Sequence, residues 1–314
     1  MNINNNFTPL AWHRGNIELQ SNRATYAFGH IVPLLASSTT FIPFQIIAAT
    51  GLIDITSAST CTIKLKNIDG TDAVNGNLFS RFGLVKVART NYDVIIYNGT
   101  NLGTALPIGQ YYLTLSSTVN GVTNTWYSDV VTIVSDTTKM TKVTWWDEPA
   151  LQSGVGVTEF GAGCIVYKYP VSGSTVQYKN SMYFLEELGM PEYTVEEEGE
   201  QRDGLFYSSK ILSGKKYKMQ IAQLSESMCD ALRFVHLSDN VQVRDGYGRM
   251  YYCDSVLVTP EWQSGAVASA SVEITTDTFV KQVGVGFTGD SPVIEGATGI
   301  IGQGVIGDTF VINA

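Results

Sequence analysis

The chain has 314 residues and a formal net charge of −9, from 29 acidic and 20 basic side chains. This balance argues against a nucleic-acid partner, because phosphate contacts require an excess of Lys and Arg on some face. Only 16% of the residues are charged and 30 are glycine, against averages of about 25% charged and about 7% glycine. We therefore expect a mainly all-β, turn-rich protein of two domains, with neutral surfaces that subunit contacts could bury.

Residues 1–34 begin with a run of asparagines and then show no sustained periodicity. We expect an N-terminal arm or an irregular first element here. The start of the chain lacks the basic and apolar regions of a secretory signal. The uncharged stretch 31–53 is long enough to raise the question of a membrane span, but it contains two prolines and a polar run at 37–40. It therefore predicts two strands and a loop, and no membrane span.

Residues 35–138 carry the pattern of a β-sandwich of the immunoglobulin or fibronectin kind. Ile63 and Leu65 alternate with polar neighbours, as in a strand with one buried face. Turn residues separate the predicted strands at regular spacing, namely Asp69 with Gly70, Asn98 with Gly99, and Asn120 with Gly121. Such pairs tolerate the positive φ of tight hairpins, so we expect a hairpin at each.

A polar gap at 136–139 is the predicted boundary to a second β-rich domain, 139–282, with one short helix. The alternation of lysines with apolar residues over 216–221 predicts a strand with one buried face. Leu224, Met228 and Leu232 recur at helical spacing, and Ser225 or Ser227 is available as the N-cap. A long hairpin is predicted over 241–258, after which Pro260 is expected to break the strand.

Residues 283–314 form a glycine-rich segment, in which G-x-G-x-x-G occurs at 284–289 and again at 302–307. A dinucleotide site needs that loop between a strand and a helix, and neither copy has room for one. We therefore predict no nucleotide or other cofactor. The interleaved Val and Ile residues predict a packed C-terminal arm that crosses onto a neighbouring subunit, as we also expect for the N-terminal arm.

The densest charge cluster is acidic and is followed closely by a basic stretch. The acidic residues are Glu196, Glu197, Glu198 and Glu200, and the basic ones are Lys210, Lys215, Lys216 and Lys218. A near-continuous acidic run lacks the spaced ligands of a calcium loop, so it favours a solvated loop. The two stretches could pair within one hairpin or across a subunit interface. Our hypothesis is that they meet between neighbouring copies.

No constellation of residues indicates an enzyme or a metal site. The four cysteines lie far apart without a C-x-x-C pair, and are most simply buried thiols. The three histidines occur singly, and no G-x-S-x-G is present. Asp147 and Glu148 follow Trp145 and Trp146, but adjacent strand residues point to opposite faces and cannot form a glycosidase pair. One of the two tryptophans is expected in the core and the other at the surface.

Several segments of both predicted domains form a recognisable set. In the first domain these are FIPFQI at 41–46, GQYYL at 109–113 and WYSDV at 126–130. In the second they are PEYTVEEEGEQRDG at 191–204, AL at 231–232, LSD at 237–239, VTPEW at 258–262 and TDT at 276–278. These segments resemble virion structural proteins of the tail or neck in phages and prophages of Bacteroidetes. The resemblance covers about residues 40–280 in matching order and brings no catalytic residues with it. It implies a structural component of the virion, made in the bacterial cytoplasm.

Together these observations predict a phage virion protein that forms a homo-oligomeric ring or collar in the tail or neck. Its partners would be copies of itself and other virion proteins. The alternative is an adhesin of the tail whose Tyr and Trp side chains bind host glycans. A depolymerase is the weakest reading, because no acid and base are placed for it.

Overall fold

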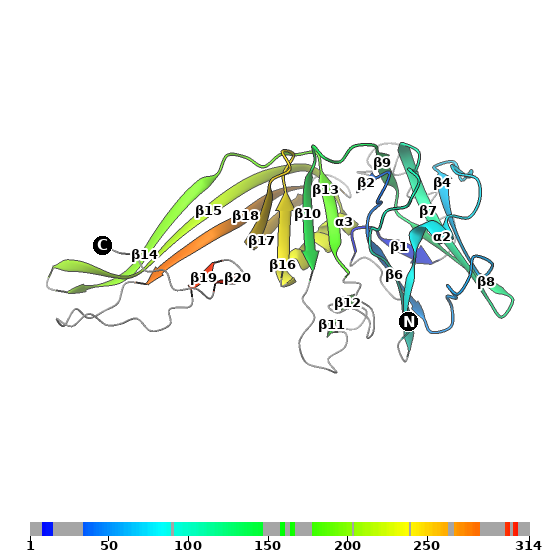
Figure 1. The fold of residues 1–314 in the computed structure, drawn as a ribbon, viewed down its shortest axis with the longest axis horizontal. Helices are drawn as coiled ribbons and strands as arrows, with labels where there is room; N and C mark the ends of the chain where they lie inside the picture. Colours follow the sequence, from blue (N-terminus) through cyan, green and yellow to red (C-terminus); the bar gives the residue numbers. More distant parts are fainter. Residues whose placement is uncertain are drawn as a thin grey trace.

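The structure is a computed structural model that describes residues 8–14, 34–88, 91–146, 158–160, 164–166, 178–202, 204–238, 240–262, 267–282, 299–301 and 304–306. The predicted all-β class is confirmed, because strands dominate these residues and the helices are short. Figure 1 shows an elongated molecule. Two small sheets lie at one end, a larger sheet lies in the middle, and three strands project at the other end.

Two sheets pack together over residues 8–134. The larger has the order β1-β8-β7-β9-β2 with β4 also on β7, and its strands are β1 (Trp12–Arg14), β2 (Leu34–Ser37), β4 (Cys61–Asn67), β7 (Gly109–Val119), β8 (Val122–Ser128) and β9 (Val131–Val134). The smaller contains β3 (Phe44–Ala49), β6 (Tyr92–Tyr97) and β5 (Val85–Ala88). The rings of Trp12 and Phe44 lie 4.9 Å apart, so side chains of both sheets meet in one core. The short helix α2 (Phe79–Phe82) adds Phe82 to it.

Part of the predicted N-terminal arm belongs to this core. Residues 8–14 include β1, which pairs antiparallel with β8, and Leu10, Ala11 and Trp12 are fully buried. This segment is therefore a strand of the chain's own sheet and not an arm available to a neighbour. The remaining residues of that prediction, 1–7 and 15–33, lie outside the described residues. The stretch 34–53 folds as β2, a loop and β3, as predicted.

Two of the predicted turn signals in this region have different outcomes. Asn120 and Gly121 have φ of +51° and +79° and join β7 to β8 in a hairpin, which confirms the prediction. The hairpin expected at Asn98 and Gly99 is wrong, because the chain there leaves β6 and crosses to the other sheet. The Tyr97 hydroxyl lies 2.7 Å from the carbonyl oxygen of Thr40 and 2.8 Å from that of Thr100 and can donate its hydrogen to either, which holds this crossing loop in place.

The third sheet has seven strands in the order β13-β10-β16-β17-β18-β15-β14. They are β13 (Asn180–Phe184), β10 (Thr141–Trp146), β16 (Asn240–Arg244), β17 (Met250–Trp262), β18 (Val267–Gln282), β15 (Leu205–Ser225) and β14 (Glu192–Arg202). Every neighbouring pair is antiparallel. Two short pairs stand apart from it, β11 (Thr158–Phe160) with β12 (Cys164–Val166), and β19 (Gly299–Ile301) with β20 (Gly304–Ile306).

The predicted helix is confirmed as α3 (Glu226–Arg233), followed by the 3-10 turn η1 (Phe234–Leu237). The Ser225 side chain caps α3 by accepting a hydrogen bond from the Met228 amide. Met228 and Leu232 are buried against the sheet. Tyr217 and Met219 are buried in the same cluster, as the alternation over 216–221 predicted. A helix of two turns is unstable alone, so this packing holds it.

Pro260 does not break the strand as predicted. It lies within β17, in register with Ala270 of β18. On its other side β17 pairs with β16 only through residues 250–252, so among the described strands β17 is an edge at Pro260. Proline is tolerated on the edge of a sheet, where its nitrogen can face away from the ladder.

The predicted boundary at 136–139 falls on the connection between β9 and β10. This connection is fixed, because Asp136 accepts a hydrogen bond from the Thr138 amide and Arg244 donates to the Thr137 carbonyl oxygen. A single cluster of buried hydrophobic side chains runs from the first two sheets into the third. In the predicted C-terminal arm, only β19 and β20 are described.

Candidate assembly surface

Three strands extend past the core of the seven-stranded sheet as an antiparallel ribbon. We define the ribbon as β14, residues 205–214 of β15 and residues 276–282 of β18. It forms the end of the molecule opposite the first two sheets (Figure 1). β15 alone has 21 residues, which at roughly 3.3 Å per residue give a strand of about 70 Å. The ribbon therefore presents a long surface away from the rest of the chain.

β14 is the edge strand of the ribbon. It pairs with β15, and no described strand pairs with its other side. Tyr193 is 73% exposed and Val195 is 66% exposed, while Glu196 and Glu198 on the opposite face are exposed as well. Over residues 192–199, neither face of β14 is therefore buried against the chain.

The acidic run was predicted to be a solvated loop, and the loop conformation is wrong. Glu196, Glu197 and Glu198 lie within β14, because β15 follows directly after a turn in which Gly204 has φ of +79° and supplies a strand partner. The backbone of Glu200 lies opposite Tyr207. Charges on an exposed edge strand discourage pairing with unrelated strands. The run is solvated, as expected, but it is held in an extended conformation.

The predicted lysines separate into two groups. Lys218 lies 2.9 Å from Glu192, Lys210 lies 3.5 Å from Glu198, and Lys216 lies 2.9 Å from Glu273. These ion pairs lie within one chain, and two of them join β14 to β15, which was one of the two possibilities that the sequence left open. The hydrogen bond with Glu192 raises the pKa of Lys218 above its usual value. Exposed pairs of this kind contribute little stability, but the carboxylates partly neutralise the lysine charges.

Lys215 belongs to a different group of side chains at the base of the ribbon. Its Nζ atom lies 5.1 Å from the ring centroid of Tyr217 and 5.9 Å from that of Tyr251. The Arg249 guanidinium lies 5.4 Å from the Tyr247 ring and 5.9 Å from the Tyr251 ring. We name this group the tyrosine patch, and its members are Tyr193, Lys215, Tyr217, Tyr247, Arg249 and Tyr251. Tyr193 joins it because it lies directly opposite Lys215.

Asp245 holds the tyrosine patch in shape. This buried carboxylate accepts hydrogen bonds from the backbone amides of Tyr247 and Arg249, and from Arg249 Nε at 2.7 Å. Burial acts to raise the pKa of Asp245, but these hydrogen bonds outweigh it and lower the pKa below 3.8. The Arg249 side chain stays 63% exposed and Tyr247 is 76% exposed. Both are fixed at the surface and reachable by a partner.

Sequence reasoning placed the 241–258 hairpin and Lys215 but did not join them into one patch. The tyrosines come from β14, β15 and β17 and from the turn after β16. They meet because β18 lies between β15 and β17 in the sheet. The order of strands is set by long-range pairing, which one sequence does not reveal. The signal that was present is the density of Tyr next to basic residues in 247–252 and 215–217.

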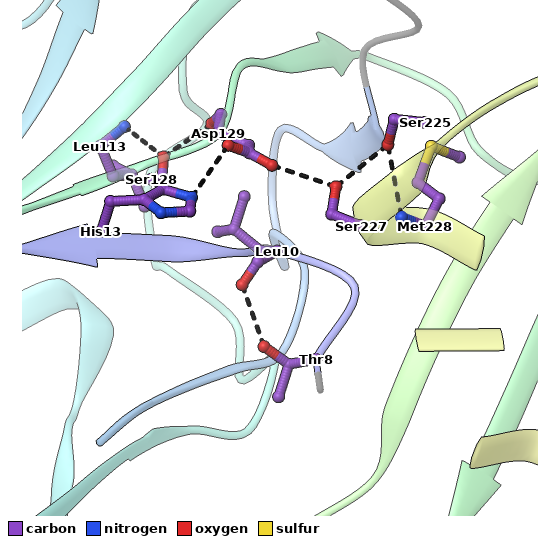
Figure 2. A network of polar contacts seen from close by, with 9 residues as sticks. All are labelled: Thr8, Leu10, His13, Leu113, Ser128, Asp129, Ser225, Ser227 and Met228. Carbon is purple, nitrogen blue, oxygen red and sulfur yellow. Dashed lines mark hydrogen bonds and ion pairs between the residues drawn. The ribbon is translucent and has the colours of Figure 1, made fainter. Parts of the chain in front are cut away.

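A polar network joins the first two sheets to α3 (Figure 2). His13 Nε2 lies 3.4 Å from Asp129 Oδ1, and the Ser227 hydroxyl donates to Asp129 Oδ2 at 3.1 Å. The residues are those of a hydrolase triad, but the order is different. The carboxylate lies between the serine and the histidine, whereas nucleophilic catalysis needs the histidine between them. This arrangement can connect β1 to α3, but it does not activate Ser227.

The other candidate sites of the sequence are placed as follows. Trp145 is buried and Trp146 is half-buried, with Lys179 Nζ 3.9 Å from the Trp146 ring, so the core and surface assignment is confirmed. Asp147, Glu148 and the first G-x-G-x-x-G lie outside the described residues. Cys61 is buried, and burial raises the pKa of its thiol to about 12. Among the described residues, no group of His, Cys, Asp and Glu has the arrangement of a metal site.

Within the described part of the chain, no helix has the length and apolar character to cross a bilayer. No protein-family model matches the chain. A search of curated proteins likewise finds no match.

Proposed function

We propose that this protein is a phage virion structural protein that forms a homo-oligomeric ring or collar in the tail or neck. The observation that carries the proposal is the ribbon, a three-stranded projection whose edge strand exposes both faces. Ordering such an edge strand costs conformational entropy, and over residues 192–199 little burial within the chain offsets it. Contact with other subunits would supply the missing burial. The resemblance of segments 41–46 and 191–204 to virion proteins gives the biological setting.

The patterns of charge and exposure also favour contact between subunits. Tyr193, Val195 and Met190 are exposed apolar or aromatic side chains close together in the chain before and along β14. Tyr, Met and Arg are enriched in protein interfaces relative to other surfaces. Charged β14 residues between them disfavour unspecific pairing and leave a selective surface. A subunit of a closed ring needs two such surfaces, one for each neighbour.

Mass photometry and negative-stain electron microscopy of the purified full-length chain test the proposal. We expect closed rings of one copy number at micromolar concentration. A chain that remains monomeric up to about 100 μM, where weak interfaces already associate, would contradict it. Antibody labelling of the particle would test the position, since label inside the capsid and not on the tail or neck contradicts the placement.

The second candidate function is a tail adhesin that binds host glycans, and the tyrosine patch favours it specifically. Exposed aromatic rings beside cationic groups can stack on sugars and bind acidic groups on them. Calorimetry with purified cell-envelope polysaccharide separates the two functions. An adhesin would bind the polysaccharide as a monomer or trimer, and Tyr247→Ala would abolish binding. A ring subunit would show no such binding.

A further inference from the structure

The middle of the edge strand β14 and the tyrosine patch carry complementary charges. Glu196 and Glu197 point to opposite faces of β14, since adjacent strand residues alternate, and both are exposed. Glu198 follows them, so β14 carries three consecutive carboxylates, of which Glu198 also pairs with Lys210 at 3.5 Å. At the base of the ribbon, Lys215 and Arg249 place two cations among tyrosine rings. One chain therefore carries both an anionic edge and a cationic, aromatic surface.

These two surfaces cannot meet within one chain. The register of β14 with β15 fixes Glu196 opposite Leu212 and Glu197 opposite Ile211, whereas Lys215 lies opposite Tyr193. Glu197 is thus four strand residues from the patch along β14, or about 13 Å. The ribbon runs away from the patch, so bending it back would break the ladder. The exposed acidic edge of another copy can reach the patch without any such change.

We propose that residues Glu196, Glu197 and Glu198 of one copy bind the tyrosine patch of the next copy, with Arg249 and Lys215 facing the carboxylates. The inference rests on the proposed assembly and names the two surfaces that make it. It differs from a contact between the two charge stretches of the sequence, because the cations it uses, Lys215 and Arg249, lie among tyrosine rings. Edge and patch are different surfaces, so the contact is heterologous and propagates around a ring.

The aromatic part of the patch makes this contact more than an attraction between opposite charges. Tyr217 and Tyr251 pack at 5.1 Å between ring centroids and leave Tyr247 and Tyr193 at the rim. An extended acidic strand laid across these rings would bury the exposed Tyr faces while Arg249 and Lys215 meet its carboxylates. Charge-assisted hydrogen bonds from Arg are directional and favour one register. The patch therefore selects an acidic strand and not an acidic surface in general.

A charge-exchange experiment tests the inference on the full chain. The first variant combines Glu196→Lys, Glu197→Lys and Glu198→Lys, and the second combines Lys215→Glu and Arg249→Glu. Each variant alone should assemble at least about tenfold more weakly than the unchanged chain, because like charges then face each other across the contact. A 1:1 mixture should assemble again, since every edge then meets a patch of opposite charge. The mixed rings should contain the two variants in equal number.

The controls separate this contact from other effects. Glu187→Lys with Glu261→Lys changes exposed acidic residues away from the proposed contact and should leave assembly unchanged. Circular dichroism melting checks that each variant is folded. Because Arg249 also binds Asp245, Tyr247→Ala provides a second patch variant that leaves this hydrogen bond in place, and it should weaken assembly as well.

The outcomes distinguish the inference from the proposed function. If the unchanged chain forms rings and both charge variants form them equally well, or if folded variants fail to assemble as a mixture, the inference is wrong and the ring remains. If the unchanged chain is monomeric at all concentrations, the proposed function itself fails. Loss of polysaccharide binding in Tyr247→Ala with unchanged assembly would overturn the inference in favour of a glycan site.

Discussion

The packed sheets of residues 34–134 and the ribbon use the same secondary structure under opposite conditions. In the former, β4 alternates buried and half-buried residues and contributes Ile63 and Leu65 to the core. In β14 the residues on both faces meet water, and ion pairs such as Lys218 with Glu192 replace apolar packing. A strand that buries one face stabilises its own domain. A strand that buries neither face leaves both faces available to another molecule.

The largest expected effect is the cost of removing a tryptophan from the packed sheets, compared with an exposed tryptophan outside them. Trp12 is 1% exposed and packs on Phe44, so Trp12→Ala should lower the free energy of unfolding by about 3–5 kcal/mol. Trp262 at the end of β17 is 54% exposed, and Trp262→Ala should change the free energy of unfolding by less than about 1 kcal/mol. Urea unfolding measures both. Equal losses would show that β1 is not part of the core.

The turn that holds the tyrosine patch should make part of the stability depend on pH. Asp245→Asn should cost about 1–2 kcal/mol at pH 7, because the charge that Arg249 binds is lost. The lowered pKa of Asp245 means that its contribution is present above pH 3.8 and is lost as the pH falls through the lowered value. The difference between the unchanged chain and the variant should therefore shrink toward pH 2. Urea midpoints from pH 7 to 2 check this, and a constant difference would contradict it.

A smaller effect is expected where the first two sheets meet α3 and the third sheet. Ser227→Ala removes the hydrogen bond to Asp129 and should lower stability by about 1 kcal/mol. Because one hydrophobic cluster spans the junction, unfolding should remain a single transition. The exposed Ser255→Ala is the matched control and should have no effect. Calorimetry that resolves two transitions, with Ser227→Ala shifting only one, would show that the regions are independent.

The smallest effect is expected in the ribbon itself. Val195→Thr keeps the size and β-branching of the side chain at an exposed position, so stability should change by less than about 0.5 kcal/mol. The same substitution at Val243 places a hydroxyl in the core and should cost about 1–3 kcal/mol. Thermal denaturation compares the two. A large loss for Val195→Thr would mean that the ribbon is packed against protein even in the monomer.

The features predicted from the sequence are those set by local pattern. The alternation at Ile63 and Leu65, the turn at Asn120 and Gly121 and the cap at Ser225 each follow from residues close in the chain. The errors arose where a distant partner decides the conformation. The segment before Gly204 has the composition of a loop and becomes a strand because β15 pairs with it, and Pro260 is accommodated because its outer side is an edge.

The candidate surface could be predicted only in part for the same reason. The acidic run and the lysines are visible in the sequence, and their charges predict that they pair. Which lysine meets which glutamate depends on register, and the register leaves Lys215 on the face of Tyr217 and not with Glu192. Arg249 enters the surface only through the order of four strands. No local signal in residues 245–251 contains that order.

The length of β15 has a mechanical consequence. This strand continues without interruption from the ribbon into the sheet under α3, and it is bonded to β18 along most of its course. A pull along the ribbon would load many of these hydrogen bonds together in shear, whereas a pull across it would open them one at a time. The β15–β18 ladder should therefore resist a pull along the ribbon better than a pull across it. Any assembly of these chains would resist tension best where the load runs parallel to β15.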